Sequence, residues 1–486
     1  MKKLSFMFAC FAMLALLTAG CPPTGEKESN GGRGGSDGKT NVVVFDEEDE
    51  YSYVSSDEII DDLDLGALEI TLEPETTKPA ELLVPIEEPA PVEESTPAVT
   101  EEAAPVEEPA PAVTEEPAPV EEAAPAAEEA PAEEGTEMGI TKAEFGEMPD
   151  GTKVDVYTLT NANGASMKVL SLGGIIYELN LPDKDGKIEN VSANLQTVNE
   201  YLTVSPNFGT LVGRYGNRIA GGKYSIDGVE IDHGDHTAGK HLLHGGKNGF
   251  HKSIWAIEEL KGDDFVGLTL KLTSGPEHQG FPGTVNCVVT YKFNNANEWE
   301  IDYTATTDAV TPINLTQHIY FNLSAFHEPT VLGEIMMLNA DKFIPVDGEL
   351  IPTGEIATVE DTPMDFRIPT SIGDRIEQVG AGYDHCWVLN KGETPDGMTL
   401  CARVLAPTSG RVMEVWTTEP GVQFYTGNFL DGEMKSGDVT YVKNAAYCLE
   451  TQHYPDSPNQ PDFPNTLVKP GETYRTTTTF KFGVQK

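Results

Sequence analysis

Apolar and polar residues alternate repeatedly after residue 139, with the period of two that predicts half-buried β-strands. In the segment 267–274, three leucines point to one face, and threonine and lysine point to the other. The same alternation occurs in the segments 284–293, 298–307 and 474–482. Strands with one buried face pack as antiparallel sheets laid face to face. The pattern therefore predicts an all-β fold, a large antiparallel β-sandwich, in residues 139–486, with a short helix at most in residues 371–380.

The N-terminal part of the chain lacks this alternation and has a different composition. The 486 residues carry a formal net charge of -47. Between Cys21 and Ile140 there are 34 Asp and Glu residues against 4 Lys and Arg residues, many of them in Pro-Ala-Glu repeats within residues 74–134. Dense proline prevents helices and sheet ladders, and like charges repel. We predict a disordered, acidic, Pro/Glu/Ala-rich spacer at residues 21–138. No part of the chain is basic enough to indicate a nucleic-acid partner.

The first residues are typical of an export signal. Two lysines precede an apolar run at residues 4–17, which is too short to span a bilayer comfortably. The run ends Leu-Thr-Ala-Gly-Cys, which resembles a bacterial lipoprotein cleavage box with Thr18 where Leu is more usual. The resemblance implies that residues 1–20 are a signal peptide and that Cys21 carries lipid. An ordinary signal peptide with a chance cysteine is the alternative. We expect a protein of the bacterial cell envelope, lipid-anchored to a membrane and facing the periplasm or the exterior.

The C-terminal stretch 448–474 contains the strongest candidate for a catalytic group. Glu450 follows the apolar run Ala445–Leu449, and a loop with five prolines comes after it. A strand that ends in a carboxylate and continues into a stiff loop can hold that carboxylate in one place, which acid–base catalysis requires. The alternative is a glutamate at a strand end that caps a turn.

This stretch resembles the C-terminal signature of the galactose mutarotases, also called aldose 1-epimerases. Further stretches match the same family in the family's order: GTLVGRYGNRIAGGKY (209–224), HLLHGGKNGFHK (241–252), INLTQHIYFNLS (313–324), GYDHCWVLN (382–390) and PGVQFYTGNFLDG (420–432). The resemblance covers nearly all of residues 142–486. It implies a mutarotase-like supersandwich and an enzyme that acts on sugars without a cofactor.

The resemblance also assigns roles to single residues. It implies that Glu450 is the catalytic base and that His318 is the general acid. It implies that the substrate is bound by Asn217, Arg218, His244, Tyr320, Asp384 and Gln423. An arginine fork and an asparagine amide can each pair with neighbouring sugar hydroxyls, which fits these residue types. Without the resemblance, the same motifs are compatible with glycine-rich turns, a surface arginine and a polar strand face exposed to solvent.

Three histidines close together in the sequence, His241, His244 and His251, raise the question of a metal site. No cysteine or carboxylate accompanies them at ligand spacing, so we expect no metal. Four cysteines of the folded part could pair in an exported protein, although Cys287 lies on an apolar strand face and is expected in the core. The proposed chemistry needs no cysteine.

The leading hypothesis is an aldose 1-epimerase that interconverts the α and β anomers of a free aldohexose, galactose or glucose. Glu450 takes the proton of the C1 hydroxyl while His318 protonates the ring oxygen, and ring closure on the other face reverses both transfers. The rival hypothesis is a surface carbohydrate-binding or sensing module without catalysis. The retention of both Glu450 and His318 argues against this rival. We expect the domain to be a monomer.

Overall fold

The computed structural model describes residues 137–485, except residues 206, 238 and 393. The signal peptide, the lipidation of Cys21 and almost all of the spacer predicted for residues 21–138 lie outside the described residues and stay predictions. Across the described residues, no helix combines the length and the apolar character needed to cross a bilayer.

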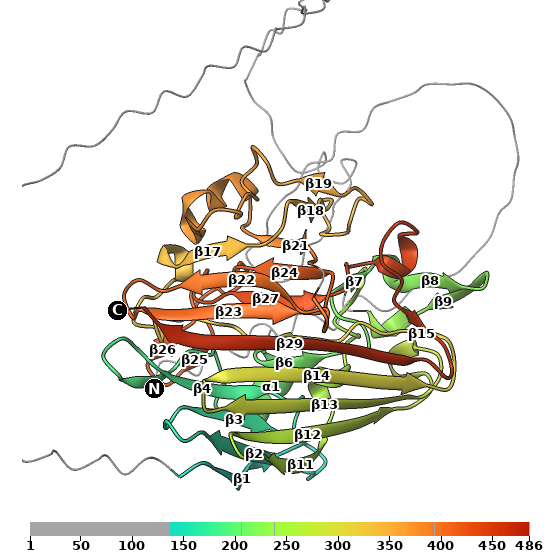
Figure 1. Cartoon of the computed structure of the whole chain (residues 1–486). Helices are drawn as coiled ribbons and strands as arrows, with labels where there is room; N and C mark the ends of the chain where they lie inside the picture. The colour runs from blue at the N-terminus through green and yellow to red at the C-terminus, as the bar shows by residue number, and fades with distance from the viewer. Residues whose placement is uncertain (1–136, 206, 238, 393, 486) are drawn as a thin grey trace, which may run out of the picture. The chain divides into compact units, whose positions relative to one another are not determined.

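The largest sheet has nine strands and runs across the domain in Figure 1. Its strands, in spatial order, are β11 (Ala256–Lys261), β12 (Phe265–Ser274), β13 (Val285–Asn294), β14 (Glu298–Thr307), β29 (Thr473–Val484), β23 (Arg411–Thr417), β22 (Thr399–Leu405), β17 (Ile335–Leu338) and β20 (Thr370–Ser371). All neighbouring strands of this sheet are antiparallel.

Two five-stranded sheets face the nine-stranded sheet. The first contains β1 (Gly139–Glu147), β2 (Lys153–Thr160), β3 (Ser166–Leu170), β4 (Ile176–Pro182) and β5 (Ile188–Asn190). The second contains, in spatial order, β19 (Ala357–Thr358), β18 (Lys342–Ile344), β21 (Asp384–Val388), β24 (Gly421–Tyr425) and β27 (Cys448–Gln452). Both are antiparallel throughout, so the predicted all-β antiparallel fold is confirmed.

The core between the layers is built by the alternation seen in the sequence. One hydrophobic cluster contains Leu159 of β2, Leu270 of β12, Trp299 of β14, Leu449 of β27 and Phe480 of β29. These residues come from all three large sheets, so a single core joins the layers into a sandwich. Full burial of each such side chain contributes about 1.5–3 kcal/mol, which makes the core the main source of stability.

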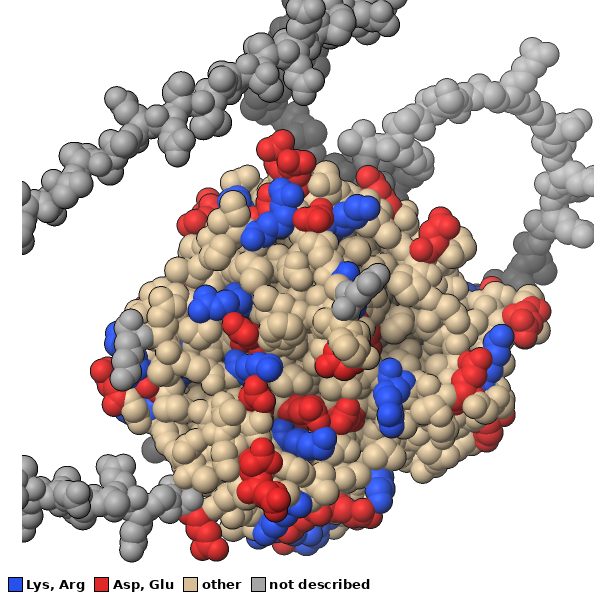
Figure 2. Space-filling view, in the orientation of Figure 1, with Lys and Arg blue, Asp and Glu red and all other residues tan. Residues whose placement is uncertain are grey.

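Short elements complete the domain. The two-stranded pairs are β6 (Thr210–Val212) with β16 (Thr316–His318), β7 (Arg218–Ile219) with β10 (Leu242–Leu243), β8 (Lys223–Ile226) with β9 (Val229–Asp232), β15 (Thr311–Pro312) with β28 (Leu467–Val468), and β25 (Lys435–Ser436) with β26 (Val439–Thr440). The one α-helix of the described residues is α1 (Val198–Thr203), and residues 371–380 form two 3₁₀ turns. The outer face of the nine-stranded sheet shows acidic and basic side chains interspersed (Figure 2), as in the ion pair between Lys292 and Glu300.

Candidate active site

Glu450 lies in the middle of β27 and is only 2% exposed. The expectation that the strand ends at Glu450 is wrong: β24 pairs with β27 as far as Gln452, so the ladder continues past the carboxylate. The turn-capping alternative is wrong for the same reason. Thr451, the next residue, hydrogen-bonds through its hydroxyl to Thr478 of β29. Because side chains alternate along a strand, Glu450 points to the opposite side, away from the nine-stranded sheet.

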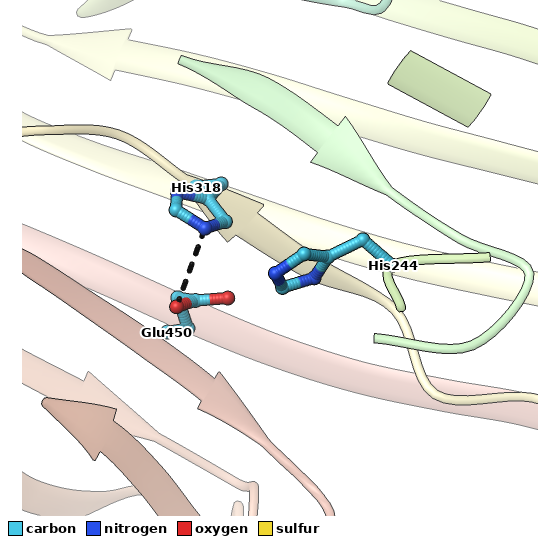
Figure 3. A group of neighbouring side chains, drawn as sticks. All are labelled: His244, His318 and Glu450. Atoms are coloured by element: carbon cyan, nitrogen blue, oxygen red, sulfur yellow. Dashed lines mark ion pairs between the residues drawn. The ribbon is translucent and has the colours of Figure 1, made fainter. Parts of the chain in front are cut away.

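His318 faces Glu450 from a different sheet. It ends β16, which pairs with β6 and lies beside β27. Its Nε2 atom is 3.6 Å from Oε1 of Glu450, and both side chains are buried (Figure 3). All residues from 313 to 324 are buried, so the alternative of a solvent-exposed polar strand face is wrong. The predicted acid and the predicted base therefore form one buried pair.

His244 completes this group from a loop after β10. Its ring centroid is 4.9 Å from that of His318 (Figure 3). Its backbone N–H donates to the carbonyl of Asn217, and the N–H of Asn217 donates in return to Nδ1 of His244. Both residues have a left-handed backbone, with φ of 50° and 62°. Since Nδ1 accepts a hydrogen bond, Nε2 carries the proton of the neutral ring and can donate to a ligand.

Three further polar side chains, Gln423, Asp384 and Arg218, lie in a connected row beside Glu450. Gln423 lies directly opposite Glu450 in the β24–β27 ladder. Its Nε2 donates to Oδ1 of Asp384 at 2.7 Å, and Oδ2 of Asp384 is 3.7 Å from Nη2 of Arg218. Oε1 of Gln423 and Oε2 of Glu450 have no hydrogen-bond partner among the described residues. Buried polar atoms of this kind are normally satisfied, so they mark places where a polar ligand can bind.

Tyr320 packs against His318. Its ring stacks on that of His318, with centroids 5.1 Å apart, and packs edge-on against Phe208 and Tyr425. Only 1% of the surface of Tyr320 is exposed, so its ring packs as a buried neighbour of the imidazole. The structure thus brings all eight residues named by the motifs into one region.

Burial dominates the electrostatics of the site. It raises the pKa of Glu450 well above its ordinary value, with a further rise from the Asp384 carboxylate and an opposing effect of Arg218. It lowers the pKa of His318 to about 4 and lowers that of His244 far below its ordinary value. In each case burial disfavours the charged form of the side chain, which is the carboxylate of Glu450 and the imidazolium of His318 and His244.

The aldose 1-epimerase family model matches residues 155–481, which is most of the described domain and contains every one of these residues. The chain belongs to the aldose 1-epimerase family. Galactose mutarotase of Rattus norvegicus is 39% identical to it over 350 residues, 71% of this chain and 99% of the rat protein. Aldose 1-epimerase of Haemophilus influenzae is 36% identical over 344 residues, 69% of this chain and 97% of that protein.

A solved structure supports the same family membership. The aldose epimerase homologue from C. elegans superimposes with a TM-score of 0.62 at 28% identity, covering 68% of this chain and 98% of that one. The mutarotase-like sandwich expected from the motifs is therefore the observed fold.

The site of this aldose 1-epimerase family member also contains three groups that can act as metal ligands. His244, His318 and Glu450 each offer one ligand atom, and these three atoms lie within 4.8 Å of one another. This differs from the group of His241, His244 and His251 considered from the sequence. However, the Nδ1 atom of His244 accepts from a backbone N–H, which leaves Nε2 protonated and unable to bind a metal. His244 is suited to donating a hydrogen bond.

Two residues near the site have contacts that the sequence did not predict. The Sγ atom of Cys448 lies 3.5 Å from Nδ1 of His318, and all four cysteines of the described domain are free and buried. Asn314 uses its amide to contact the backbone of His453 and of Gly216. Asn314 lies in a segment where other polar residues, such as Thr316 and Gln317, are frequent, so no sequence signal singles it out.

Proposed function

We propose that Glu450 and His318 carry out the proton transfers of an aldose 1-epimerase. As a member of this family, the chain is an enzyme that interconverts the anomers of an aldose. The observation that supports the assignment most strongly is the buried contact of 3.6 Å between His318 Nε2 and Glu450 Oε1. At this separation, the carboxyl and the imidazole can each form a hydrogen bond with one of the two oxygens bonded to C1 of a sugar ring, the C1 hydroxyl and the ring oxygen.

The reaction needs one proton to leave and one to arrive. The Glu450 carboxylate takes the proton of the C1 hydroxyl, and the His318 imidazolium gives a proton to the ring oxygen. The bond between C1 and the ring oxygen breaks, which leaves an open-chain aldehyde, a protonated Glu450 and a neutral His318. After rotation about the C1–C2 bond, the ring oxygen attacks the other face of the aldehyde and both protons return.

The pair keeps the same total charge throughout this cycle. An ionised Glu450 beside a protonated His318 has no net charge, and a protonated Glu450 beside a neutral His318 has none either. Burial raises the pKa of Glu450 and lowers that of His318, so the site favours states in which the pair holds one proton. A buried site can therefore pass through both forms without gaining an uncompensated charge.

The remaining polar groups hold the hydroxyls that do not react. Arg218 and Asp384 present a donor and an acceptor side by side, and Oε1 of Gln423 is an open acceptor next to Glu450. Nε2 of His244 is a donor directed at the catalytic pair. Such mixed donors and acceptors match the vicinal hydroxyls of an aldohexose. Galactose is the proposed substrate because several relatives are named galactose mutarotase, and glucose is the alternative.

We also propose that the domain acts at the cell envelope as a monomer. The proposed location rests on the N-terminal sequence, in which the predicted signal peptide, residues 1–20, precedes Cys21 and an acidic, proline-rich segment follows. An acyl chain at Cys21 would anchor the protein by burying methylene groups in a bilayer.

Polarimetry with freshly dissolved α-galactose and α-glucose tests the function. The proposal predicts that the protein accelerates the drift of optical rotation to the same equilibrium value that is reached without it. The rival sugar-binding module would bind galactose, measured by calorimetry, and leave the rate of drift unchanged.

A further inference from the structure

Asp456 is a buried carboxylate that the catalytic proposal does not use. It lies in the loop after β27, six residues beyond Glu450, and only 1% of its surface is exposed. Its backbone is left-handed, with φ of 57°. No Lys or Arg among the described residues forms an ion pair with it closer than 4.0 Å. Burial raises its pKa, so a carboxyl at this place costs free energy that its contacts must offset.

Asp456 makes two backbone contacts just after Arg218, on either side of Ile219. The N–H of Asp456 donates to the carbonyl of Arg218 at 2.8 Å. Its Oδ1 accepts the N–H of Ala220, two residues further on, at 2.9 Å. One residue thus fixes the peptide groups before and after Ile219, which directly follows Arg218 in β7.

The loop that carries Asp456 is itself held in place. Asn459 donates to Oδ1 of Asp456 and to the carbonyl of Lys223, so it bridges the loop to β8. Gln460 donates to Oδ2 of Asp456. The hydroxyl of Tyr215 accepts from the N–H of Ser457 and donates to a carbonyl of the same loop. The loop after the catalytic strand is therefore bonded repeatedly to the segment that presents Arg218.

We propose that Asp456 is a positioning residue for substrate binding, because it holds the backbone of Arg218 so that the guanidinium lies beside Asp384 before the sugar arrives. This inference rests on the proposed function, in which Arg218 binds a sugar hydroxyl. Preorganisation of this kind lowers the cost of ordering a long side chain when the ligand binds. Asp456 does not touch the reacting atoms, so its loss should weaken binding more than proton transfer.

The test is the kinetics of Asp456→Ala beside Asp462→Ala, a matched control from the exposed part of the same loop. We expect Asp456→Ala to raise KM on the order of tenfold, because a hydrogen bond to a charged group is lost, with kcat within about threefold of wild type. The control should leave both unchanged. A uniform loss of structure would instead lower the melting temperature and the active fraction without this split between KM and kcat.

A second variant removes the same contact from the other side, in case Asp456→Ala does not fold. Ala220→Pro deletes the N–H that Asp456 accepts. Ala220 is the first residue of the 3₁₀ turn η1 (Ala220–Gly222) and follows Ile219 in extended backbone, with φ of -119° and ψ of 120°, where a following proline is tolerated. It should raise KM in the same way as Asp456→Ala.

Arg218→Ala separates this inference from the proposed function. If Asp456 acts through Arg218, adding Asp456→Ala to Arg218→Ala should raise KM by less than twofold more. Unchanged KM in Arg218→Ala would overturn the proposed role of Arg218. A raised KM in Arg218→Ala, with unchanged KM in both Asp456→Ala and Ala220→Pro, would overturn the positioning role alone. Fully additive effects would overturn it as well.

Discussion

The buried carboxyl of Glu334 should make the stability of the domain fall as pH rises, and Glu334→Gln should remove this fall. Glu334 is 4% exposed and its Oε1 accepts the N–H of Leu323, in the motif that contains His318. Its Oε2 has no hydrogen-bond partner within the described part of the chain. Burial raises its pKa from 4.5 to about 8. The carboxyl therefore stays protonated in the folded domain at neutral pH, whereas it ionises in the unfolded chain.

The size of the effect follows from these two pKa values. The folded pKa lies above the unfolded one, so the contribution to stability is complete below pH 4.5 and is lost as pH rises to 8. Each pH unit in that window costs about 1.4 kcal/mol. Between pH 5 and pH 8, the free energy of unfolding of the wild type should fall by about 3 to 4 kcal/mol more than that of Glu334→Gln. Other titrating groups cancel in this difference, since both proteins contain them.

Urea unfolding at pH 5, 6, 7 and 8 measures this difference. The glutamine keeps the acceptor for Leu323 and cannot ionise, so its stability should depend less on pH than that of the wild type. Glu328→Gln, an exposed change in the same region, is the control and should follow the wild type. Curves for wild type and Glu334→Gln that stay parallel from pH 5 to 8 would refute the reasoning.

Three further predictions concern the site and the anchor. Arg218→Ala should raise KM for galactose about tenfold or more with a smaller change in kcat, measured by polarimetry, because it removes a hydroxyl-binding fork. The wild-type kcat/KM should fall as pH drops to about 4, because His318 is then protonated while Glu450 still holds a proton, so the pair carries two protons. His318→Asn should lack this acid limb. A kcat/KM that already falls near pH 6.5 would contradict the assignment. Cys21→Ser should release the protein from the membrane fraction or leave it uncleaved, as seen by fractionation and blotting, without altering the activity of the domain.

The sheet layers could be predicted from the sequence because their signal is local. In β14, Trp299 and Ile301 are buried while Glu300 and Asp302, which alternate with them, are not, and this alternation is visible in the sequence itself. The residues of the site could be named only because ordered motifs resembled a known family. Their roles remain proposals that the experiments above address.

What the sequence could not predict depends on contacts between distant segments. The extension of β27 past Glu450 follows from pairing with β24, which the local apolar run does not encode. The orientation of His244 depends on a reciprocal pair of hydrogen bonds with Asn217, 27 residues away. Asp456 looks like a turn residue among prolines, and its contact with Ala220 spans 236 residues. Such contacts exist only once the sheets are assembled.

The most direct test of the central claim is the rate of galactose mutarotation by Glu450→Gln, followed by polarimetry alongside galactose binding by calorimetry. The change keeps the size of the side chain and one of its acceptor atoms but removes the base. We predict that kcat falls by at least ~10²-fold while the Kd for galactose stays within a few-fold of wild type. Glu433→Gln, an exposed change, should behave as wild type. A Glu450→Gln protein that mutarotates galactose at nearly the wild-type rate would contradict the account.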